Sequence, residues 1–240
     1  MTYKGTSILA VVPARGGSKG IPRKNLAKVG GTSLIGWAAR TVADLPWIDA
    51  AVLSTDDEEM AAEGKACGLE VPFMRPDEFA TDGASSVGMW QHAWRESERA
   101  FGRVFDVSVL LQPTTPLRQP DDVRRCVDAV VEDGHRAATT VSRVPGHFTP
   151  EKTLSLDDDG VIEFIMGDRA VHGARQAIPA YHYRNGICYA VTRETLLDHG
   201  HIVEDDCVGV EIDRFIVNID EPFELELAEF MLDKERRNED

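Results

Sequence analysis

The sequence predicts an α/β protein that is built on a doubly wound, mostly parallel sheet. Short apolar segments alternate along the chain with longer segments in which apolar residues recur at helical spacing, which is the pattern of repeated strand–helix units. The first apolar segment, residues 7–14, is almost uninterrupted and ends in turn residues. Such a run is typical of a strand that is buried on both faces, which indicates a parallel sheet with helices on either side.

The 240 residues are enough to form one substantial hydrophobic core, so we expect a single domain over residues 1–240. The formal net charge of −15 argues against a nucleic-acid backbone or an anionic membrane as the partner. No apolar run approaches the length of a membrane span, no signal peptide is evident, and the cysteines are scattered without close pairs. These features predict a cytoplasmic protein that binds neither nucleic acid nor membrane.

A glycine-rich and basic loop follows the first predicted strand. Residues 15–25 read Arg-Gly-Gly-Ser-Lys-Gly-Ile-Pro-Arg-Lys-Asn. The glycines permit backbone conformations in which several main-chain N–H groups converge on one anion. The cations of the loop are Arg15, Lys19, Arg23 and Lys24. In an acidic protein, this concentration of positive charge indicates a polyphosphate ligand. The P-loop pattern and the G-x-G-x-x-G dinucleotide fingerprint are both absent from the sequence.

Periodicity predicts the remaining elements. Further strands are expected at residues 50–55, 106–112, 137–143, 185–191, 211–213 and 215–220. Helices are expected at residues 32–43, 57–66, 121–131 and 222–237, and another helix after residue 86 carries Trp90 and Trp94 in a buried stripe. The carboxylates of residues 56–59 are interpreted as a helix cap, with a metal site as the alternative. Residues 144–183 break the pattern, and alternation around residues 157–160 predicts a β-hairpin.

Several ordered segments resemble one known family. Residues 14–25, residues 111–118 (Leu-Gln-Pro-Thr-Thr-Pro-Leu-Arg) and residues 185–191 are similar to signature segments of the cytidylyltransferases that activate sialic acid and related nine-carbon 2-keto acids. The resemblance spans nearly the whole chain. It implies a Rossmann-like, GT-A-like nucleotidyltransferase fold with a mostly parallel mixed sheet flanked by helices. It also implies that residues 144–184 form a β-hairpin insertion that dimerises and contributes residues to the partner's active site.

The resemblance implies a reaction in which CMP is transferred from CTP to the 2-hydroxyl of a nonulosonic acid and pyrophosphate is released. The acceptor would be an acid of the sialic, legionaminic or pseudaminic type. Mg²⁺ would be the cofactor, and the enzyme would be a homodimer. Catalysis of such a transfer consists mainly of positioning and neutralisation of charge.

The same resemblance implies the site residues. Those that bind the nucleotide would be Ala14, Arg15, Gly16, Gly17, Ser18, Lys24, Asn25, Arg75, Ser85 and Ser86, and Asp82 fits the same pattern. Those that bind the sugar would be Gln112, Lys152, Arg175, Gln176, Arg184 and Asn185. Arg15, Lys24 and Asp220 would be catalytic. Asp220 would hold the metal, with Asn218 as a second contact, because a carboxylate oxygen suits Mg²⁺.

The sequence departs from the family pattern at two places. The usual Asp-x-Asp before the last helix is Asn218-x-Asp220 here, so the second metal contact would be a neutral oxygen and therefore weaker. The usual arginine two residues before Asn185 is replaced by Tyr183, and Arg184 is adjacent to the asparagine instead. A shift of one residue along a strand can turn a side chain to the other face.

Two alternatives remain open at this point. A related enzyme of the same fold could use another sugar or nucleotide, as a Kdo cytidylyltransferase or a sugar-1-phosphate nucleotidyltransferase does, because Arg15, Lys24 and Gln112 would serve it equally well. A non-catalytic nucleotide-binding homologue is the second alternative, and the changes at Asn218 and Arg184 favour it.

Overall fold

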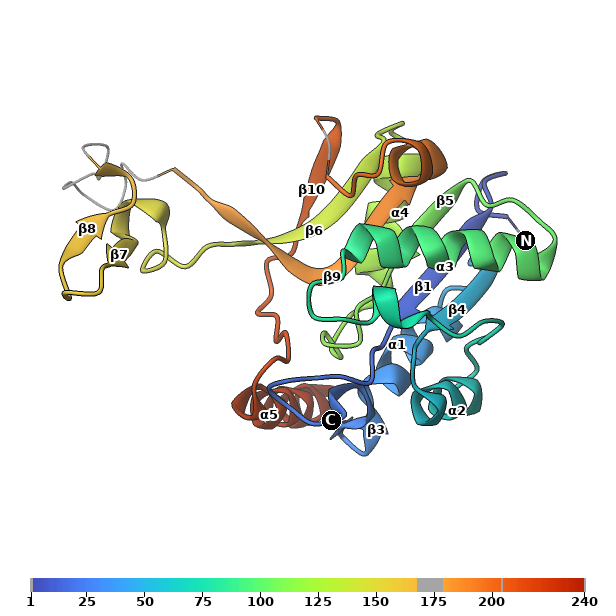
Figure 1. The fold of residues 1–240 in the computed structure, drawn as a ribbon, viewed down its shortest axis with the longest axis horizontal. Helices are drawn as coiled ribbons and strands as arrows, with labels where there is room; N and C mark the ends of the chain where they lie inside the picture. The colour runs from blue at the N-terminus through green and yellow to red at the C-terminus, as the bar shows by residue number, and fades with distance from the viewer. Residues whose placement is uncertain (1, 168–178, 204, 240) are drawn as a thin grey trace.

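The computed structural model describes residues 2–167, 179–203 and 205–239 (Figure 1). Its centre is a six-stranded sheet in the order β10–β6–β9–β5–β1–β4. The strands are β1 Ile8–Pro13, β4 Ala50–Ser54, β5 Val107–Leu110, β6 Ala137–Arg143, β9 His182–Thr192 and β10 Cys207–Glu211. Within this sheet β9 pairs antiparallel with β5 and β6, and the other pairs are parallel. The predicted mostly parallel mixed sheet is therefore confirmed.

Helices cover both faces of the sheet (Figure 1). One face carries α3 Ser86–Phe101, and the other carries α1 Leu34–Ala43, α2 Glu58–Ala66 and α4 Pro120–Val131. Alternate residues of β1 serve the two faces: Leu9 packs in the cluster with α3, and Ala10 packs in the cluster with the other helices. Residues 8–12 have no exposed surface, as predicted for a strand buried on both sides. Trp90 and Trp94 are also fully buried, which confirms their predicted place in the core.

Side chains cap the first turns of α1 and α2. Ser33 caps α1, where its Oγ accepts a hydrogen bond from the Gly36 amide at 2.9 Å. Asp57 caps α2 by accepting from the amides of Glu59 and Met60, each at 3.0 Å. The interpretation of residues 56–59 as a helix cap therefore holds through one carboxylate. None of the helices within the described ranges is long and apolar enough to cross a membrane.

A third apolar cluster joins the end of the chain to its beginning. Two short strands, β2 Lys28–Val29 and β3 Thr32–Ser33, form a ribbon on which α5 Pro222–Glu239 packs. Residues 212–221, which precede α5, contain no strand, so the strands predicted at 211–213 and 215–220 are wrong apart from residue 211. Val217 and Ile219 are buried against α5 rather than in the sheet. The short helical turns are η1 Lys24–Leu26, η2 Asp77–Phe79, η3 Pro150–Lys152 and η6 Glu194–Asp198.

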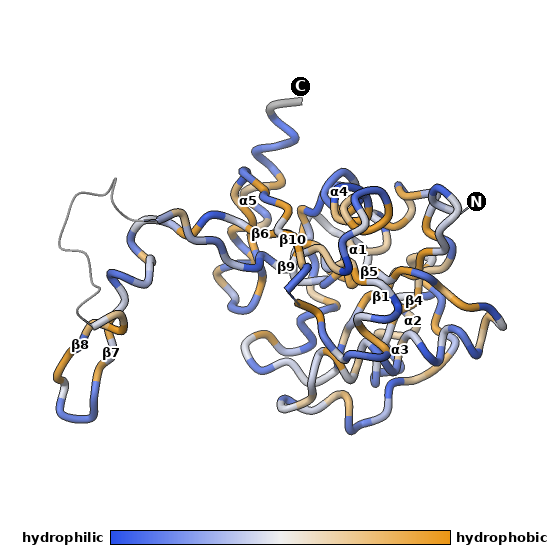
Figure 2. The backbone as a smooth tube through the Cα atoms, turned by 90° about the horizontal axis from the view of Figure 1, so that it is seen from above, coloured by the Kyte–Doolittle hydropathy of each residue, from blue (hydrophilic) through white to orange (hydrophobic). Residues whose placement is uncertain are grey.

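An arm projects from the body on the extended ends of β6 and β9 (Figures 1 and 2). Its tip is an antiparallel hairpin of β7 Leu154–Leu156 and β8 Ile162–Phe164, so the predicted hairpin is confirmed. Asp157 shapes the turn, because its Oδ1 accepts from the amides of Asp159 and Val161 at 3.0 and 2.8 Å. That the arm dimerises stays a prediction.

Candidate active site

A cavity of about 450 Å³ lies at the carboxyl ends of β1 and β5. In the sheet, β4 lies on one side of β1 and β5 lies on the other, so the chain reverses its direction of progress across the sheet at β1. This is the topological switch point of the sheet, where open α/β sheets bind their ligands. Its polar lining consists of Arg15, Ser18, Lys19, Lys24, Asn25, Arg75, Thr81, Asp82, Ser85, Ser86, Gln112, Thr114, Asp220 and Glu221.

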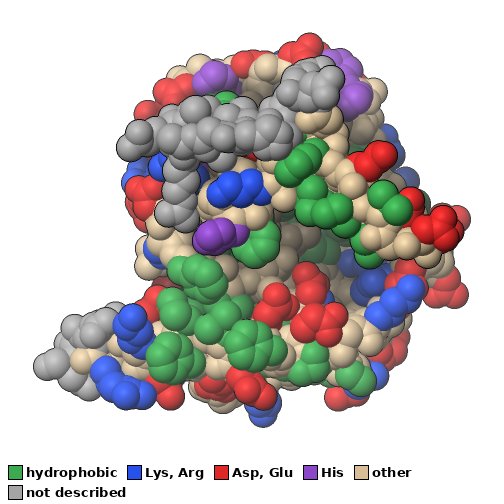
Figure 3. All heavy atoms as spheres, turned by 90° about the vertical axis from the view of Figure 1, so that its left-hand side faces the viewer, with side chains coloured by type: hydrophobic (Ala, Val, Ile, Leu, Met, Phe, Trp, Pro, Cys, Tyr) green, Lys and Arg blue, Asp and Glu red, His purple; other side chains and the backbone are tan. Residues whose placement is uncertain are grey.

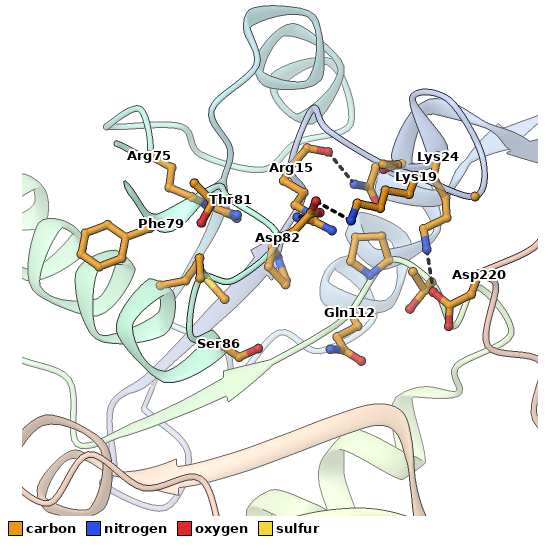
Figure 4. A pocket seen from close by; sticks show the side chains of 18 of the residues that line it. Arg15, Lys19, Lys24, Arg75, Phe79, Thr81, Asp82, Ser86, Gln112 and Asp220 are labelled. Carbon is orange, nitrogen blue, oxygen red and sulfur yellow. Dashed lines mark hydrogen bonds and ion pairs between the residues drawn. The ribbon is translucent and has the colours of Figure 1, made fainter. Parts of the chain in front are cut away.

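The glycine-rich loop forms one wall of the cavity (Figure 4). Ala14 is buried and its amide donates to the Ser54 carbonyl at 3.0 Å, which extends the pairing of β1 with β4. Arg15 is thus the first loop side chain that faces the cavity. Asn25, also buried, donates from Nδ2 to the Arg15 carbonyl at 3.3 Å and so ties the two ends of the loop together.

Two loop glycines are fixed by the acidic residues around them. The Gly16 amide donates to Asp56 Oδ1 at 3.0 Å, so this amide is already used, and neither Gly16 nor Gly17 lines the cavity. A Cβ atom at Gly20 would clash with the Asp220 carbonyl oxygen. Only glycine therefore lets the loop approach the segment before α5 so closely.

The loop cations separate into two groups. Arg15 NH1 and Lys19 Nζ each lie 2.8 Å from the Asp82 carboxylate, and Lys24 Nζ lies 2.7 Å from Asp220 Oδ1. These three cations line the cavity (Figure 4). Arg23 points elsewhere and pairs with Asp57 and Glu59, each at 2.8 Å. The sequence places four cations in one loop, and the structure shows that three of them share the cavity.

The opposite wall comes from the segment between β4 and α3. Arg75 is buried, and its guanidinium donates to the Ser54 hydroxyl at 3.0 Å and also to the Ser54 carbonyl. Burial lowers the pKa of Arg75 to about 10, so it remains charged at neutral pH. Ser85 Oγ caps α3 by accepting from the Val87 amide at 3.2 Å, and Ser86 opens that helix. Sequence reasoning missed the apolar part of this wall, which Phe79 and Met89 form.

The loop after β5 is held in place by a buried arginine. Arg118 donates to the carbonyls of Gln112 and Ile187, each at 2.6 Å, and to Thr115 Oγ1 at 2.8 Å. Burial lowers the pKa of Arg118 to about 10. Gly186 faces the same loop with a φ of +79°, and a Cβ there would lie 2.8 Å from Gln112 Oε1. The Arg118 contacts hold the loop backbone, and the missing Cβ of Gly186 leaves room for the Gln112 side chain at the edge of the cavity. Arg118 belongs to the 111–118 motif, but nothing in the sequence predicted that it would hold this loop in place.

Most of the predicted sugar-binding residues that the structure describes lie outside this cavity. Asn185 is a buried residue of β9, and its side chain contacts β6, where it accepts from Thr140 Oγ1 at 2.6 Å and donates to Ser142 Oγ at 3.0 Å. Arg184 is exposed on β9, and Lys152 is exposed at the base of the arm. Of the predicted sugar-binding residues that the structure describes, Gln112 lines the cavity. Arg175 and Gln176 lie outside the described residues.

The predicted metal position lies at the mouth of the cavity. Asp220 is largely exposed there, and its backbone is fixed because Glu224 Oε2 accepts from the amides of Asp220 and Glu221 at 2.6 and 2.8 Å. Asn218 Nδ2 lies 3.5 Å from Asp220 Oδ2. Within the described ranges, no three His, Cys, Asp or Glu side chains gather as a complete metal site. Mg²⁺ in nucleotide sites needs only one or two carboxylates beside the phosphates, so this donor set fits it.

A cavity lined by arginine and lysine side chains at the switch point of a mixed α/β sheet is typical of a nucleotide-binding protein. The sequence profile described as cytidylyltransferase matches residues 9–160. The chain therefore belongs to the cytidylyltransferase family. The class predicted from the motifs, a nucleotidyltransferase, is confirmed.

Several characterised proteins are similar to the chain over almost its full length. The CMP-N,N'-diacetyllegionaminic acid synthase of Legionella pneumophila is 27% identical, over 94% of this chain and 96% of that protein. A pseudaminic acid cytidylyltransferase of Campylobacter jejuni is 25% identical, over 93% and 95%. The post-translational flagellin modification protein B of Campylobacter coli is 26% identical, over 95% of each.

Solved structures show the same fold. A CMP:2-keto-3-deoxy-manno-octonic acid synthetase that was solved with CTP superposes with a TM-score of 0.73, at 17% identity, over 96% of this chain and all of that one. The 4-diphosphocytidyl-2C-methyl-D-erythritol synthase of Anaerococcus prevotii superposes with a TM-score of 0.62, at 15% identity, over 95% and 99%. The predicted nucleotidyltransferase fold is confirmed.

Proposed function

We propose that the protein transfers CMP from CTP to the 2-hydroxyl of a nine-carbon 2-keto sugar acid and releases pyrophosphate. The observation that carries this proposal is the convergence of Arg15, Lys19 and Lys24 at the carboxyl ends of β1 and β5, opposite Asp220. A triphosphate needs several cations at close range, and this cavity supplies them in a strongly acidic protein. The relatives named for legionaminic and pseudaminic acids support the acceptor class.

In this proposal the loop holds the triphosphate. Arg15 and Lys24 neutralise the charge that builds on the phosphates as the acceptor oxygen bonds to the α-phosphorus and the bond to the pyrophosphate oxygen breaks. Lys24 can reach the phosphates because its ion pair with Asp220 lies at the cavity mouth. Mg²⁺, when bound, would polarise the phosphate oxygens. Asp220 and the Asn218 amide oxygen would hold it there.

The wall opposite the loop would accept the base and ribose. Ser85, Ser86 and Arg75 are predicted there from sequence, and all three line the cavity. The Arg75 guanidinium is already committed to the end of β4, so we propose that it shapes this wall rather than grips the nucleotide. Phe79 and Met89 supply the apolar surface against which a base could pack.

We also propose that the enzyme is a homodimer whose arms complete the site of the opposite copy. The paired residues Leu156 and Ile162 of the hairpin are mostly exposed, and a two-stranded hairpin alone is marginally stable in water. Figure 3 shows that apolar side chains gather on the side of the molecule that bears the arm. Lys152 and Arg184 lie outside the cavity of their own chain, so a second copy is the place where they could meet a sugar acid.

The compartment is a proposal as well. Cys67, Cys126 and Cys188 are thiols outside any disulfide, which suits the reducing cytoplasm. A cytoplasmic enzyme would meet CTP and its acceptor there.

A pyrophosphate-release assay tests the proposed function. The purified protein should release pyrophosphate with CTP, Mg²⁺ and an acid of the sialic, legionaminic or pseudaminic type, and much less with ATP, GTP or UTP. Turnover with Kdo or a sugar 1-phosphate, and with none of these acids, would instead identify a related nucleotidyltransferase that uses another sugar. Nucleotide binding without pyrophosphate release on any acceptor would select the non-catalytic alternative.

A further inference from the structure

Asp82 occupies the position in the cavity where an anionic ligand would meet the glycine-rich loop. One carboxylate oxygen accepts from Arg15 NH1 at 2.8 Å, and the other lies 2.8 Å from Lys19 Nζ (Figure 4). Hydrogen bonds from Lys19 and then Arg15 lower the pKa of Asp82, so its carboxylate is ionised at neutral pH. An internal anion thus pairs with two of the three cations of the glycine-rich loop that line the cavity.

The segment that carries Asp82 is anchored at both ends and forms an exposed turn in the middle. Buried Arg75 holds one end to β4, and Ser85 caps α3 at the other. Between them the Ala84 amide donates to the Thr81 carbonyl at 3.1 Å, which closes a tight turn around Asp82 and Gly83. The Asp82 side chain is 49% exposed, so its carboxylate can rotate into water without burying a charge. A ligand could therefore displace it by a local movement.

We propose that Asp82 is an internal competitor for the phosphate site, which holds Arg15 and Lys19 until a polyphosphate displaces it. The inference rests on the proposed binding of a triphosphate by the loop. Exposed ion pairs are individually weak, so a ligand with about four negative charges can exchange with one carboxylate. After pyrophosphate departs, the Asp82 carboxylate returns to the two cations and disfavours rebinding.

Removal of the charge at Asp82 separates this role from direct ligand contact. Asp82→Asn should bind CTP and inorganic pyrophosphate about threefold to tenfold more tightly than the wild type in isothermal titration, because no carboxylate has to be displaced. Cytidine, which has no phosphate, should bind both proteins equally. The gain for pyrophosphate should shrink in 0.5 M salt, since ions screen exposed pairs.

Two variants control for net charge and for loop structure. Asp77→Asn removes the same charge from η2, and Asp77 does not line the cavity, so its affinity for both ligands should change less than twofold. Asp82→Glu keeps the carboxylate and should restore affinities close to those of the wild type. Together they attribute any gain to the carboxylate at Asp82 rather than to the lower total charge.

Unchanged or weaker binding of CTP and pyrophosphate by Asp82→Asn would overturn the proposal, since Asp82 would then be idle or would assist the ligand. Pyrophosphate contains no cytidine, so its titration tests Asp82 even if the wild type fails to bind CTP. If the wild type binds pyrophosphate but not CTP, the proposed function is contradicted, and the pyrophosphate titrations still test the inference about Asp82. Failure of the wild type to bind either ligand would end both.

Discussion

Lys24 and Asp220 form an ion pair of 2.7 Å across the cavity mouth, although 196 positions separate them in the sequence. The pair joins the first loop of the chain to the segment before the last helix. It places the proposed phosphate-binding cation beside the proposed metal ligand, so both can act on the same phosphates. The side chain of Lys24 is mostly buried, whereas that of Asp220 is mostly exposed.

Removal of the positive charge of Arg15 or of Lys24 should strongly lower the rate of turnover. Arg15→Ala and Lys24→Ala should each reduce kcat/KM for CTP by about 100-fold or more, because each removes positive charge from the reacting phosphates. Arg23→Ala is the matched control, since Arg23 belongs to the same loop but pairs outside the cavity, and its effect should stay within a few fold. Steady-state pyrophosphate release measures all three. Near-normal rates for both Arg15→Ala and Lys24→Ala would contradict the proposed role of the loop.

The metal position predicts opposite effects at two neighbouring residues. Asp220→Asn should raise the Mg²⁺ concentration that gives half-maximal activity, because it removes the carboxylate at the cavity mouth. Asn218→Asp should lower that concentration, since it places a second carboxylate two residues away. Binding of Mn²⁺ in the presence of CTP, followed by electron paramagnetic resonance, should change in the same directions without any dependence on turnover. If both variants keep the wild-type metal dependence in both measurements, Asp220 does not hold the metal.

Much of this site can be predicted from sequence because it depends on local pattern and on one rule of topology. The apolar run of β1 and the turn residues after it are contiguous, and parallel strands bring their carboxyl ends to one edge of the sheet. These two features are enough to place Arg15 and Gln112 at the same edge. The direction of Arg23 cannot be predicted in this way, because it depends on Asp57 and Glu59 from another element.

The end of the chain shows a second limit of prediction from sequence. The alternation in residues 215–220 suggests a strand, but this segment packs in the cluster around α5, and the Ile219 amide donates to the Thr114 carbonyl at 2.8 Å. Periodicity also groups Phe223 and Phe230 on the core face of that helix, whereas both are exposed and Ala228 and Leu232 are buried. The packing partner of α5 is the β2–β3 ribbon, and its position is not encoded in the periodicity of the helix.

Acidic pH should destabilise the protein through His92. Its ring lies between Phe73 and Phe79, with centroids 5.5 and 5.2 Å away, and burial lowers its pKa below 6.5. The unfolded chain therefore takes up a proton at a higher pH than the folded chain does. The contribution of neutral His92 to stability should be complete above pH 6.5 and should be lost as pH falls through the lower folded value.

Urea unfolding at several pH values between 7.5 and 5 measures this effect. The free energy of unfolding of the wild type should fall over that range more steeply than that of His92→Gln, which cannot be protonated. His135→Gln is a suitable control, because His135 lies outside the two phenylalanine rings and pairs with Asp206 at the surface. Parallel curves for the wild type and His92→Gln would show that this histidine does not cause the pH dependence.

The absence of a side chain at Gly186 should matter in two ways: it permits the positive φ of that residue, and it leaves room for the Gln112 side chain. Gly186→Ala introduces a Cβ that would lie 2.8 Å from Gln112 Oε1, and it also strains a residue with a φ of +79°. Gly134 has the same φ, and a Cβ there would meet no atom of the described residues within 4 Å, so Gly134→Ala carries the strain alone. Each should lose about 1–2 kcal/mol of stability from strain. Only Gly186→Ala should also raise KM for the sugar acid, and equal KM values in the two variants would contradict the role of Gln112.

The exposed face of the arm predicts that a single added charge will separate the proposed dimer. Leu156 and Ile162 are cross-strand partners on one face of the hairpin, whereas Ser155 and Glu163 form the neighbouring pair on the other face. Leu156→Lys and Ile162→Lys should therefore yield monomers by light scattering, because a buried charge without a partner is costly. Ser155→Lys adds the same charge opposite Glu163 and should remain dimeric.

Activity should follow the oligomeric state if the arm completes the opposite site. The monomeric variants should still bind CTP, since Arg15 and Lys24 belong to the same chain, but KM for the sugar acid should rise because Lys152 and Arg184 lie outside their own cavity. An active wild-type monomer would contradict this arrangement directly. If both Leu156→Lys and Ile162→Lys remain dimeric, the hairpin does not form the dimer interface.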